Sequence, residues 1–451
     1  MKIRNLIALA AVVVLMFSCQ NETVYQEASV DGLSLSTKKG ADSDFMVIAK
    51  SESLSDALMA EVGKYGTVKR TIPQIGIMVV KPNDDTFEAK VSKLAEVKYV
   101  APDLEVNWLE PMDYEPMANP PSIGDDDKYF KYQWGLDAIN APEAWNAGYT
   151  GEGARVAILD SGMDGTHPDL SPNINTELST SFVPDEDWMS TSSFNHGTHV
   201  AGIVAAADNY VGDLNTGVIG VAPHAELVAV KVLSEFTGSG AFSWINAGIV
   251  YAADIDADVI NMSLGAAFYK NGPYAQAVLH AQQRAIDYAF RKGTLVVTSA
   301  GNNYMNADGN RSIVVTPADL NNVVAVSATA PYGWAYDTST NLDLPASYSN
   351  IGRSLVTVGA PGGDFDHPGG YWYYDMVLSS IPGGWGWMAG TSQASPHVAG
   401  VAALIIGKNG GEMDPHEVEK QLVKTADKID TNGNSIFYGK GRVNAYRAVT
   451  E

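Results

Sequence analysis

The sequence contains a single cysteine, Cys19, which lies near its N-terminus. Disulfide bonds therefore cannot hold the folded part of the chain together, and its stability has to come from packing and bound ions. Positive charge is also scarce, with 29 Lys and Arg against 52 Asp and Glu and a formal net charge of −23. This balance argues against sequence-independent binding of nucleic acid, which depends on Lys and Arg neutralising phosphates.

The N-terminal residues have a basic start followed by an apolar run from Leu6 to Phe17. The run is too short to span a bilayer, and residues 1–18 have the anatomy of a signal peptide. Cys19 follows one small residue after this run, which resembles the lipobox of bacterial lipoproteins. The resemblance implies cleavage before Cys19, lipidation of its sulfur, and an exported bacterial protein anchored at the cell envelope or surface. A plain signal peptide, followed by secretion without a lipid, is the alternative.

Three segments follow that differ in composition. Residues 19–43 are mostly polar and predict a flexible tether with little to bury. Residues 44–110 contain apolar and helical patterns in the order strand, helix, strand, strand, helix, strand, which predicts a small α+β (βαββαβ) domain. Residues 111–127 are rich in Pro and acidic residues and predict a linker open to proteolysis.

Residues 128–451 show a different pattern. Continuous apolar runs, such as RVAILD and TLVVTSAGN, alternate with longer helical patterns. Strands that are apolar throughout are buried on both faces, so the pattern predicts an α/β domain with a mainly parallel sheet between helices. Functional side chains in such sheets collect at the carboxyl ends of the strands.

Three residues suited to nucleophilic catalysis lie at strand ends or helix starts. Asp160 ends the strand RVAILD, His196 begins a helix at HGTHVAG, and Ser392 begins another at TSQASPHVAG. A serine hydroxyl becomes nucleophilic when a histidine takes its proton and a carboxylate orients that histidine. The order Asp, His, Ser along the chain differs from the Ser, acid, His order of α/β-hydrolases and the His, Asp, Ser order of chymotrypsin.

From about Tyr132 to the C-terminus the chain resembles the subtilases. The resemblance rests on DSGMDGTHPDL around Asp160, NHGTHVAG around His196 and AGTSQASPHVAG around Ser392. It implies the subtilisin-like three-layer fold and a serine endopeptidase that acts on proteins or peptides through an acyl-enzyme. It also implies that Asn302, in TLVVTSAGN, donates to the oxyanion; a simple turn asparagine is the alternative.

The resemblance further implies that an extended peptide lies between the segments FTGSG and NMSLG, where glycines allow close backbone approach. Simple turn glycines are the alternative. Val315 stands near the base of the first specificity pocket, where a glycine is common, so we expect a short pocket that prefers small or medium apolar residues. The substrate-binding residues expected in this way are Gly238, Gly240, Ser263, Leu264, Gly265, Asn303 and Val315.

Residues 44–110 resemble the inhibitor-type propeptide of subtilases, chiefly in KRTIPQIGIMVVK and VKYVAPDLEV. The resemblance implies a domain that templates folding, blocks the cleft and is removed by the enzyme itself, with the cut between about Pro111 and Lys128. A permanent N-terminal domain is the alternative. Asp169 matches a calcium ligand of the family and the loop AADNYVGDLNTGVIG is rich in oxygen donors, so structural calcium is the expected cofactor.

A rival interpretation from another functional class is a catalytically silent surface protein that binds peptides with the same fold. The presence of every catalytic residue named above argues against it, because a binding protein does not need all of them. An aromatic insertion, GGYWYYDM, runs from Gly369 to Met376 shortly before the nucleophile. It either shapes the far side of the cleft or packs within its own loop.

Overall fold

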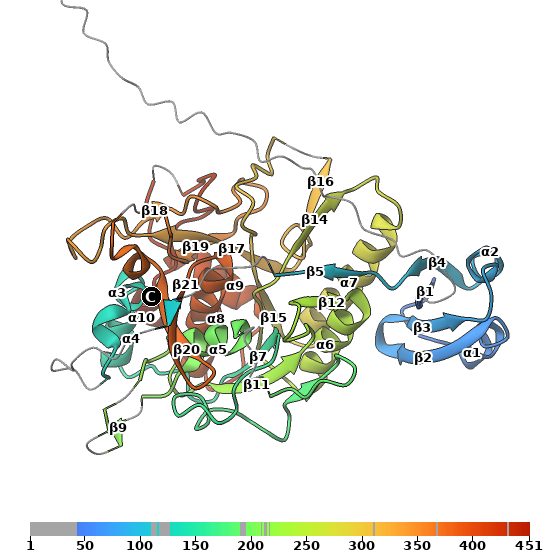
Figure 1. Cartoon of the computed structure of the whole chain (residues 1–451), viewed down its shortest axis with the longest axis horizontal. Coiled ribbons are helices and arrows are strands. Elements are labelled where there is room, and N and C mark those ends of the chain that lie inside the picture. Colours follow the sequence, from blue (N-terminus) through green and yellow to red (C-terminus); the bar gives the residue numbers. More distant parts are fainter. Residues whose placement is uncertain are drawn as a thin grey trace, which may run out of the picture.

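The computed structural model describes residues 43–109, 115–116, 127–189, 195–208, 210–211, 214–215, 217–309, 312–366, 369–430 and 433–451. Cys19, the predicted signal peptide, the predicted tether and most of the predicted linker lie outside these residues. Within the described part of the chain, no helix is long and apolar enough to cross a membrane. A small N-terminal domain lies beside a larger one that contains the main sheet (Figure 1).

The N-terminal domain is built on a four-stranded antiparallel sheet in the order β2-β3-β1-β4. Its elements follow the predicted order of strand, helix, strand, strand, helix, strand. Ser55 caps the first helix by accepting a hydrogen bond from Leu58 N at 3.0 Å. The elements are β1 (Phe45–Ala49), α1 (Asp56–Val62), β2 (Gly66–Ile72), η1 (Pro73–Ile75), β3 (Ile77–Pro82), α2 (Phe87–Val91) and β4 (Val97–Pro102).

The larger domain is organised around an eight-stranded sheet, which confirms the predicted α/β class. The strands follow the order β18-β17-β15-β13-β7-β11-β8, with β19 also paired to β17, and every pair except β17 with β18 is parallel. The strands are β7 (Arg155–Asp160), β8 (Thr180–Ser181), β11 (Glu226–Lys231), β13 (Val259–Met262), β15 (Leu295–Ser299), β17 (Val323–Ala330), β18 (Leu344–Pro345) and β19 (Val358–Pro361).

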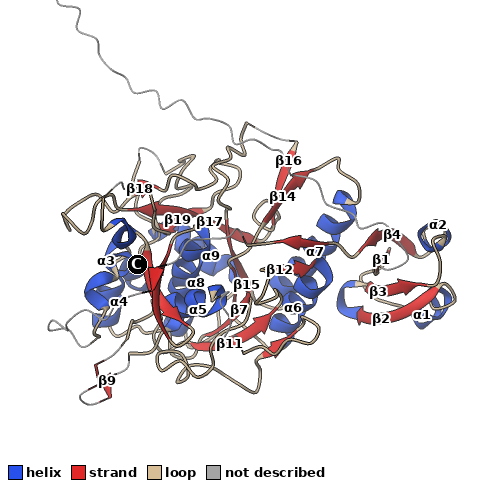
Figure 2. Ribbon diagram, viewed as in Figure 1, coloured by secondary structure: helices blue, strands red, loops and turns tan. Residues whose placement is uncertain are grey.

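Helices cover both faces of this sheet (Figure 2). On β7, Val156 and Ile158 join the apolar cluster that contains residues of α5, α8, α9 and α10. The alternate residues Ala157 and Leu159 join the cluster on the other face, with α6 and α7. The helices are α3 (Trp134–Ala138), α4 (Ala141–Asn146), α5 (His196–Ala205), α6 (Phe242–Asp254), α7 (Ala275–Arg291), α8 (Thr391–Lys408), α9 (Pro415–Thr425) and α10 (Ala445–Thr450).

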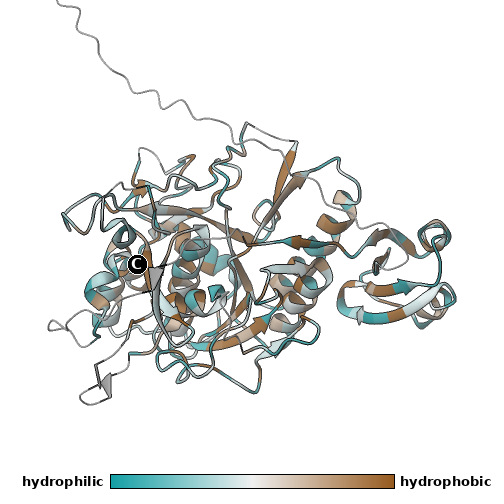
Figure 3. Cartoon of the chain, in the orientation of Figure 1, coloured by the Kyte–Doolittle hydropathy of each residue, from teal (hydrophilic) through white to brown (hydrophobic). Residues whose placement is uncertain are grey.

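Short strands and 3-10 turns lie outside the main sheet and its helices. Figure 3 shows hydrophobic residues along β11 of the main sheet and along the pair β14 and β16. These smaller elements are β5 (Glu105–Asn107), β6 (Glu115–Pro116), η2 (Phe130–Tyr132), β9 (Tyr210–Val211), β10 (Leu214–Asn215), β12 (Ser239–Ala241), β14 (Ala266–Tyr269), β16 (Ile313–Thr316), η3 (Trp372–Asp375), β20 (Val377–Ile381) and β21 (Gly384–Met388).

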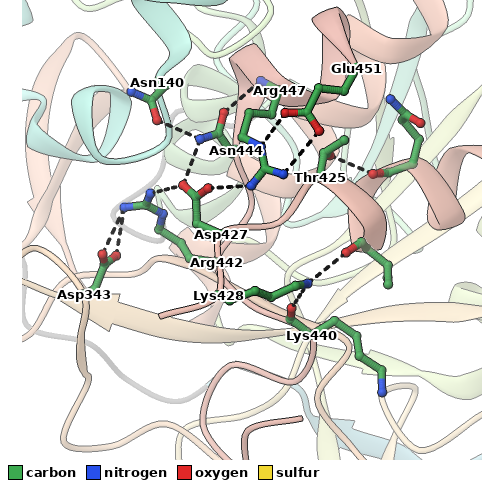
Figure 4. A network of polar contacts seen from close by, with 12 residues as sticks. Asn140, Asp343, Thr425, Asp427, Lys428, Lys440, Arg442, Asn444, Arg447 and Glu451 are labelled. Atoms are coloured by element: carbon green, nitrogen blue, oxygen red, sulfur yellow. Dashed lines mark hydrogen bonds and ion pairs between the residues drawn. The ribbon is translucent and has the colours of Figure 1, made fainter. Parts of the chain in front are cut away.

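A polar network fastens the C-terminal segment to the rest of the fold (Figure 4). Arg442 forms ion pairs with Asp343 at 2.9 Å and with Asp427 at 2.6 Å. Arg447, on α10, contacts Asp427 at 3.0 Å and Glu451 at 2.8 Å. Asp343 directly precedes β18 and Asp427 follows α9, so these pairs join the C-terminal segment to the end of α9 and to the distant start of β18.

The N-terminal domain packs against α7 and the start of α6. Arg284, which is buried on α7, donates hydrogen bonds to four backbone carbonyls of that domain, those of Ala49, Lys50, Ser51 and Ile75, at 3.0–3.2 Å. At α6, Asp103 accepts hydrogen bonds from the backbone and hydroxyl of Ser243. The two domains therefore share a polar as well as an apolar interface.

Candidate active site

The site begins with a histidine and an aspartate at the carboxyl edge of the main sheet. Asp160 is the last residue of β7, and His196 is the first residue of α5. The Nδ1 atom of His196 lies 2.9 Å from Oδ1 and 3.0 Å from Oδ2 of Asp160. Both side chains are buried, with relative exposures of 5% and 1%. A carboxylate in this position holds the imidazole so that Nε2 faces away from it.

The serine lies at the N-terminus of α8. Ser392 is the second residue of that helix and is 6% exposed. Its hydroxyl donates to the carbonyl oxygen of Ser263 at 3.2 Å, and the Ser263 hydroxyl donates to the carbonyl of Ser392 at 2.7 Å. Ser263 directly follows β13, the neighbour of β7 in the sheet, so the serine lies at the same edge as Asp160.

The expected hydrogen bond between the serine and the histidine is not formed in this state. His196 Nε2 is buried and has no hydrogen-bond partner among the described residues. The Ser392 hydroxyl instead points to the Ser263 carbonyl. Catalytic hydrogen bonds often tighten only as the reaction begins, and a rotation about the Cα–Cβ bond of a serine redirects its hydroxyl.

Asn302 follows β15 and is oriented by a neighbour of the serine. Its Oδ1 accepts hydrogen bonds from the backbone N of Thr391 at 2.9 Å and from the Thr391 hydroxyl at 2.7 Å. The Thr391 hydroxyl in turn accepts from Gly301 N at 3.0 Å. Because Oδ1 is held by these donors, the amide N–H₂ is directed away from them and is available to an oxyanion. The sequence did not identify Thr391 as the residue that orients Asn302.

A segment of the N-terminal domain already lies along the expected substrate-binding strands. β5 pairs antiparallel with β12, with Val106 opposite Gly240 and Asn107 opposite Ser239. The next residue, Trp108, accepts a hydrogen bond on its carbonyl from Gly265 N at 3.2 Å, and its indole donates to the Gly240 carbonyl at 2.8 Å.

The two expected glycines of this strand have different geometries. A Cβ atom on Gly240 would lie 2.5 Å from the Val232 carbonyl, so only glycine fits there. Gly238 precedes β12 in a left-handed conformation, with φ of 66°, which is the geometry of a turn. Leu264 is buried with Phe242 and Phe268 in the apolar cluster that also holds the Trp108 ring.

Val315 and Asn303 flank the position expected for the first specificity pocket. Val315 is buried on β16, and its Cγ1 lies 3.7 Å from where a Cβ on Gly301 would stand. Its methyl groups therefore fill space beside the strand end that bears Asn302. Asn303 is exposed, and its backbone N donates to Asn350 Oδ1 at 3.1 Å.

Asp169, the expected calcium ligand, is fully buried. Its Oδ2 accepts hydrogen bonds from Val218 N at 3.0 Å and from the Trp385 indole at 2.7 Å. No group of three or more His, Cys, Asp or Glu side chains suited to a metal ion occurs among the described residues. Calcium also binds backbone carbonyls, and parts of the loop over residues 209–216 lie outside the described residues.

A buried charge at Lys231 was not predicted. This residue ends β11 opposite Asp160 and is completely buried. Its Nζ lies 3.0 Å from carboxylate oxygens of both Glu186 and Glu235, and a buried charge of this kind needs such partners. The three side chains join two loops next to β12. A lysine inside the apolar run VAVKVL was the only signal in the sequence.

The chain is similar to known proteins over most of its length. A model of the subtilase family matches residues 151–441. Over 442 residues the chain is 34% identical to a thermophilic serine proteinase of Bacillus sp. (strain AK1), covering 97% of this chain and 95% of that protein. It is 40% identical to subtilisin NAT of Bacillus subtilis subsp. natto over 316 residues, which is 70% of each protein.

Among solved structures, the epidermin leader peptide processing serine protease of Staphylococcus aureus is similar with a TM-score of 0.73. The match covers 90% of this chain and 97% of that one at 23% sequence identity. At this identity the likeness shows the shared fold.

Proposed function

The chain belongs to the subtilase family and is a serine endopeptidase, and we propose that it cleaves peptide bonds through an acyl-enzyme on Ser392. One observation carries this assignment of roles. The buried Asp160–His196 pair leaves Nε2 of the histidine without a partner at the sheet edge where Ser392 lies.

In the first half of the reaction, the Ser392 hydroxyl turns from the Ser263 carbonyl towards His196 Nε2, which takes its proton. The serine oxygen bonds to the substrate carbonyl carbon, and the negative charge that develops on the carbonyl oxygen is met by the Asn302 amide. The backbone N–H of Ser392 is a second donor, since N–H groups in the first turn of a helix lack intrahelical partners. The C–N bond then breaks, and His196 gives its proton to the leaving amine.

In the second half, water replaces the leaving amine. His196 takes a proton from the water, the resulting oxygen attacks the acyl carbon, and the bond to Ser392 breaks as the serine regains its proton. Asp160 stays ionised and stabilises the imidazolium in both halves.

Labelling with a fluorophosphonate probe tests these roles. The mature enzyme is expected to react, and Ser392→Ala is expected to abolish the labelling. Ser339→Ala removes an exposed serine hydroxyl elsewhere in the same domain, so it is the control and is expected to label normally. A protein that binds peptides but does not react with the probe would instead be the catalytically silent peptide-binding protein.

We also propose that residues 44–110 are a removable inhibitor and that the self-processing cut lies between about residues 111 and 128. The support is the position of β5 and Trp108 along the expected substrate strands. An inhibitor in this position has to leave before a substrate can bind. N-terminal sequencing of the mature protein tests the cut, and a mature chain that starts before residue 111 would overturn it.

The expected preference for small or medium apolar residues before the cut bond is a proposal that rests on Val315. Its buried side chain beside Gly301 takes up space that a glycine would leave open. A peptide-library cleavage profile tests this preference. Efficient cleavage after Phe, Tyr or Arg would contradict it.

Calcium near Asp169 is a further proposal. A cation would be bound through the buried Asp169 carboxylate, whose Oδ2 also accepts hydrogen bonds from Val218 N and the Trp385 indole. Bound calcium would stabilise the fold around Asp169 and has no part in the chemistry. Chelation is then expected to lower the melting temperature, and an unchanged melting temperature would contradict the site.

Export and lipid attachment at Cys19 complete the proposal, and the anatomy of residues 1–19 supports them. Labelling of cells with an alkyne fatty acid, with Cys19→Ala as the comparison, separates a lipid-anchored enzyme from a secreted one. Loss of label in the Cys19→Ala protein supports the anchor. Equal signals from both proteins would favour the plain signal peptide.

A further inference from the structure

A buried asparagine lies behind the turn that bears Asn302. Asn350 is located between β18 and β19, and its relative exposure is 0%. Its Oδ1 accepts hydrogen bonds from the backbone N of Asn303 at 3.1 Å and of Met305 at 2.9 Å. Its Nδ2 donates to the carbonyl of Ala300 at 2.9 Å. These partners lie on both sides of Asn302, so one side chain joins the two flanks of that residue.

The three partners allow only one orientation of the Asn350 amide. Two backbone N–H groups need an oxygen that accepts, and a carbonyl needs a nitrogen that donates. Exchange of the amide oxygen and nitrogen would break all of these hydrogen bonds. The side chain therefore fixes where the backbone before Asn302 lies with respect to the backbone after it.

The turn around Asn302 depends on partners from outside it. After the end of β15, Gly301 has φ of 97° and Tyr304 has φ of 51°, so regular strand pairing stops there. Backbone groups of such a turn need other hydrogen-bond partners. Asn350 supplies them from its side chain, and its own backbone N donates to the Gly301 carbonyl at 2.8 Å. A Cβ on Gly301 would lie 2.4 Å from Asn350 Nδ2, so the close approach requires glycine.

Asn302 is thus held at two levels. Thr391 orients its side chain, because the backbone N and the hydroxyl of Thr391 both donate to Asn302 Oδ1. Asn350 holds the backbone from which that side chain extends. An oxyanion donor lowers the barrier only when it is already in place, and a displacement of about 1 Å can cost roughly 100-fold in rate.

We propose that Asn350 is a positioning residue for the oxyanion donor Asn302. Asn350 is fully buried, so it acts by fixing the turn and not by contact with the substrate. This inference rests on the proposed endopeptidase function and adds to it a residue behind the oxyanion site. Because the action passes through Asn302, the loss of Asn350 should have little effect on catalysis once the Asn302 amide has been removed.

A double-mutant cycle on the mature enzyme tests this proposal. Asn350→Ala alone is expected to lower kcat by about 10- to 100-fold with little change in KM. In the Asn302→Leu enzyme, the same substitution is expected to lower kcat by less than about threefold, because residues that act through one another are not additive. Equal losses in both enzymes would overturn the proposal. A change confined to KM would also overturn it, because Asn350 would then act through the substrate pocket at Asn303.

A second buried asparagine separates positioning from a general loss of stability. Asn444 also forms its side-chain hydrogen bonds within the large domain, in the C-terminal network with Asn140, Asp427 and Arg447 (Figure 4). Asn444→Ala is the matched control, and it is expected to lower the melting temperature but to leave kcat unchanged. If it lowers kcat as much as Asn350→Ala does, the effect at Asn350 is one of stability and the proposal fails.

Asn350→Ser repeats the measurement if Asn350→Ala does not fold. The serine keeps a hydroxyl at the buried position, but its shorter side chain can reach at most one flank of Asn302. A several-fold loss of kcat is expected, again only when the Asn302 amide is present. An unchanged kcat in a folded Asn350→Ser enzyme would overturn the proposal. If the enzyme with its natural residues neither cleaves peptides nor reacts with a fluorophosphonate at Ser392, the proposed function itself has failed.

Discussion

The two sheets of this protein bury their faces in different ways. On β1 of the N-terminal domain, Val47 and Ala49 pack into the domain's own apolar cluster. Met46 and Ile48, on the opposite face of the same strand, belong to the cluster shared with α6 and α7. One face of this small sheet is therefore covered only by the other domain.

The main sheet, by contrast, is covered by helices of its own domain on both faces. All residues of the cluster around α5 and α8 come from Tyr129 onwards. Loss of the N-terminal domain would leave that cluster intact, whereas the N-terminal domain alone would expose Met46, Ile48 and their neighbours. The N-terminal domain therefore depends on the larger domain to bury one face of its sheet. The larger domain depends less on the N-terminal domain.

The largest expected effect follows from loss of the proposed nucleophile, Ser392. Ser392→Ala should lower kcat for peptide hydrolysis by about 10⁶-fold, as loss of the corresponding serine does in subtilisin. If the N-terminal domain is removed by the enzyme itself, this variant should also keep it covalently attached. Activity assays and mass spectrometry of the variant made alone measure both effects. A trimmed Ser392→Ala protein would show that another protease makes the cut.

A smaller effect is expected at Asn302, where a substitution should slow catalysis without changing how the domains dock. Asn302→Leu removes the proposed oxyanion donor and should lower kcat by about 10²–10³-fold with little change in KM. Self-processing should slow by a similar factor. Asn321→Leu, at an exposed position, is the control. A change confined to KM would assign Asn302 to substrate binding instead.

The docking of the small sheet itself can be weakened at Arg284. Arg284→Ala, placed in the uncut Ser392→Ala chain, removes buried donors to four carbonyls and should weaken docking by about 2–5 kcal/mol. Arg291→Ala on the same helix is the matched control. It removes an exposed pair with Glu52, where side-chain exposures are 51% and 57%, so its effect should be below about 1 kcal/mol.

Hydrogen exchange of the strand amides in β1 and β3 measures this docking. Arg284→Ala should raise exchange there and leave β13 and β15 unchanged. Equal exchange in the Arg284→Ala and Arg291→Ala chains would show that the apolar face alone holds the domain.

The smallest expected effect is a dependence of docking on pH. Burial raises the pKa of Asp103 to about 6, although hydrogen bonds from Ser243 act in the opposite direction. In the undocked domain the pKa should return towards about 3.9. Because the docked state binds the proton more tightly, docking should be strongest near pH 4 and weaken as the pH rises through about 6, by roughly 1–3 kcal/mol.

The urea midpoint for undocking, measured at several pH values in the Ser392→Ala chain, tests this. Asp103→Asn keeps an acceptor for Ser243 and should remove the Asp103 contribution to the pH dependence. Asp44 and Arg70, which also act on Asp103, remain in that variant. A midpoint that rises with pH would contradict the assigned direction.

Much of the fold was predictable because it depends on local patterns. Continuous apolar runs such as RVAILD predicted buried parallel strands, and the structure has β7 there. The roles of Asp160, His196 and Ser392 remain proposals, but their positions at a strand end and two helix starts agree with the sequence. Tertiary burial sets the chemistry of two further histidines, because it lowers the pKa of His199 to about 3 and that of His397 to about 4.

Contacts between distant segments could not be predicted in the same way. Thr391 orients Asn302 across 89 positions of sequence, and Ser263 holds the Ser392 hydroxyl across 129. Lys231 contacts Glu186 because two loops converge at the end of β11. No periodicity within a single segment encodes such pairs.

The sequence by itself determined the type of chemistry, the class of the main sheet and the order of strands and helices in the N-terminal segment. These follow from residue identity, order and short-range hydrophobic pattern, which every segment has before it folds. Only the tertiary structure decided that β5 lies on β12, that β6 lies on β21, and that one face of the small sheet is buried against α6 and α7. The physical reason is that strand pairing and face burial gain free energy from partners far along the chain, and a segment's own residues do not specify which partner completes it.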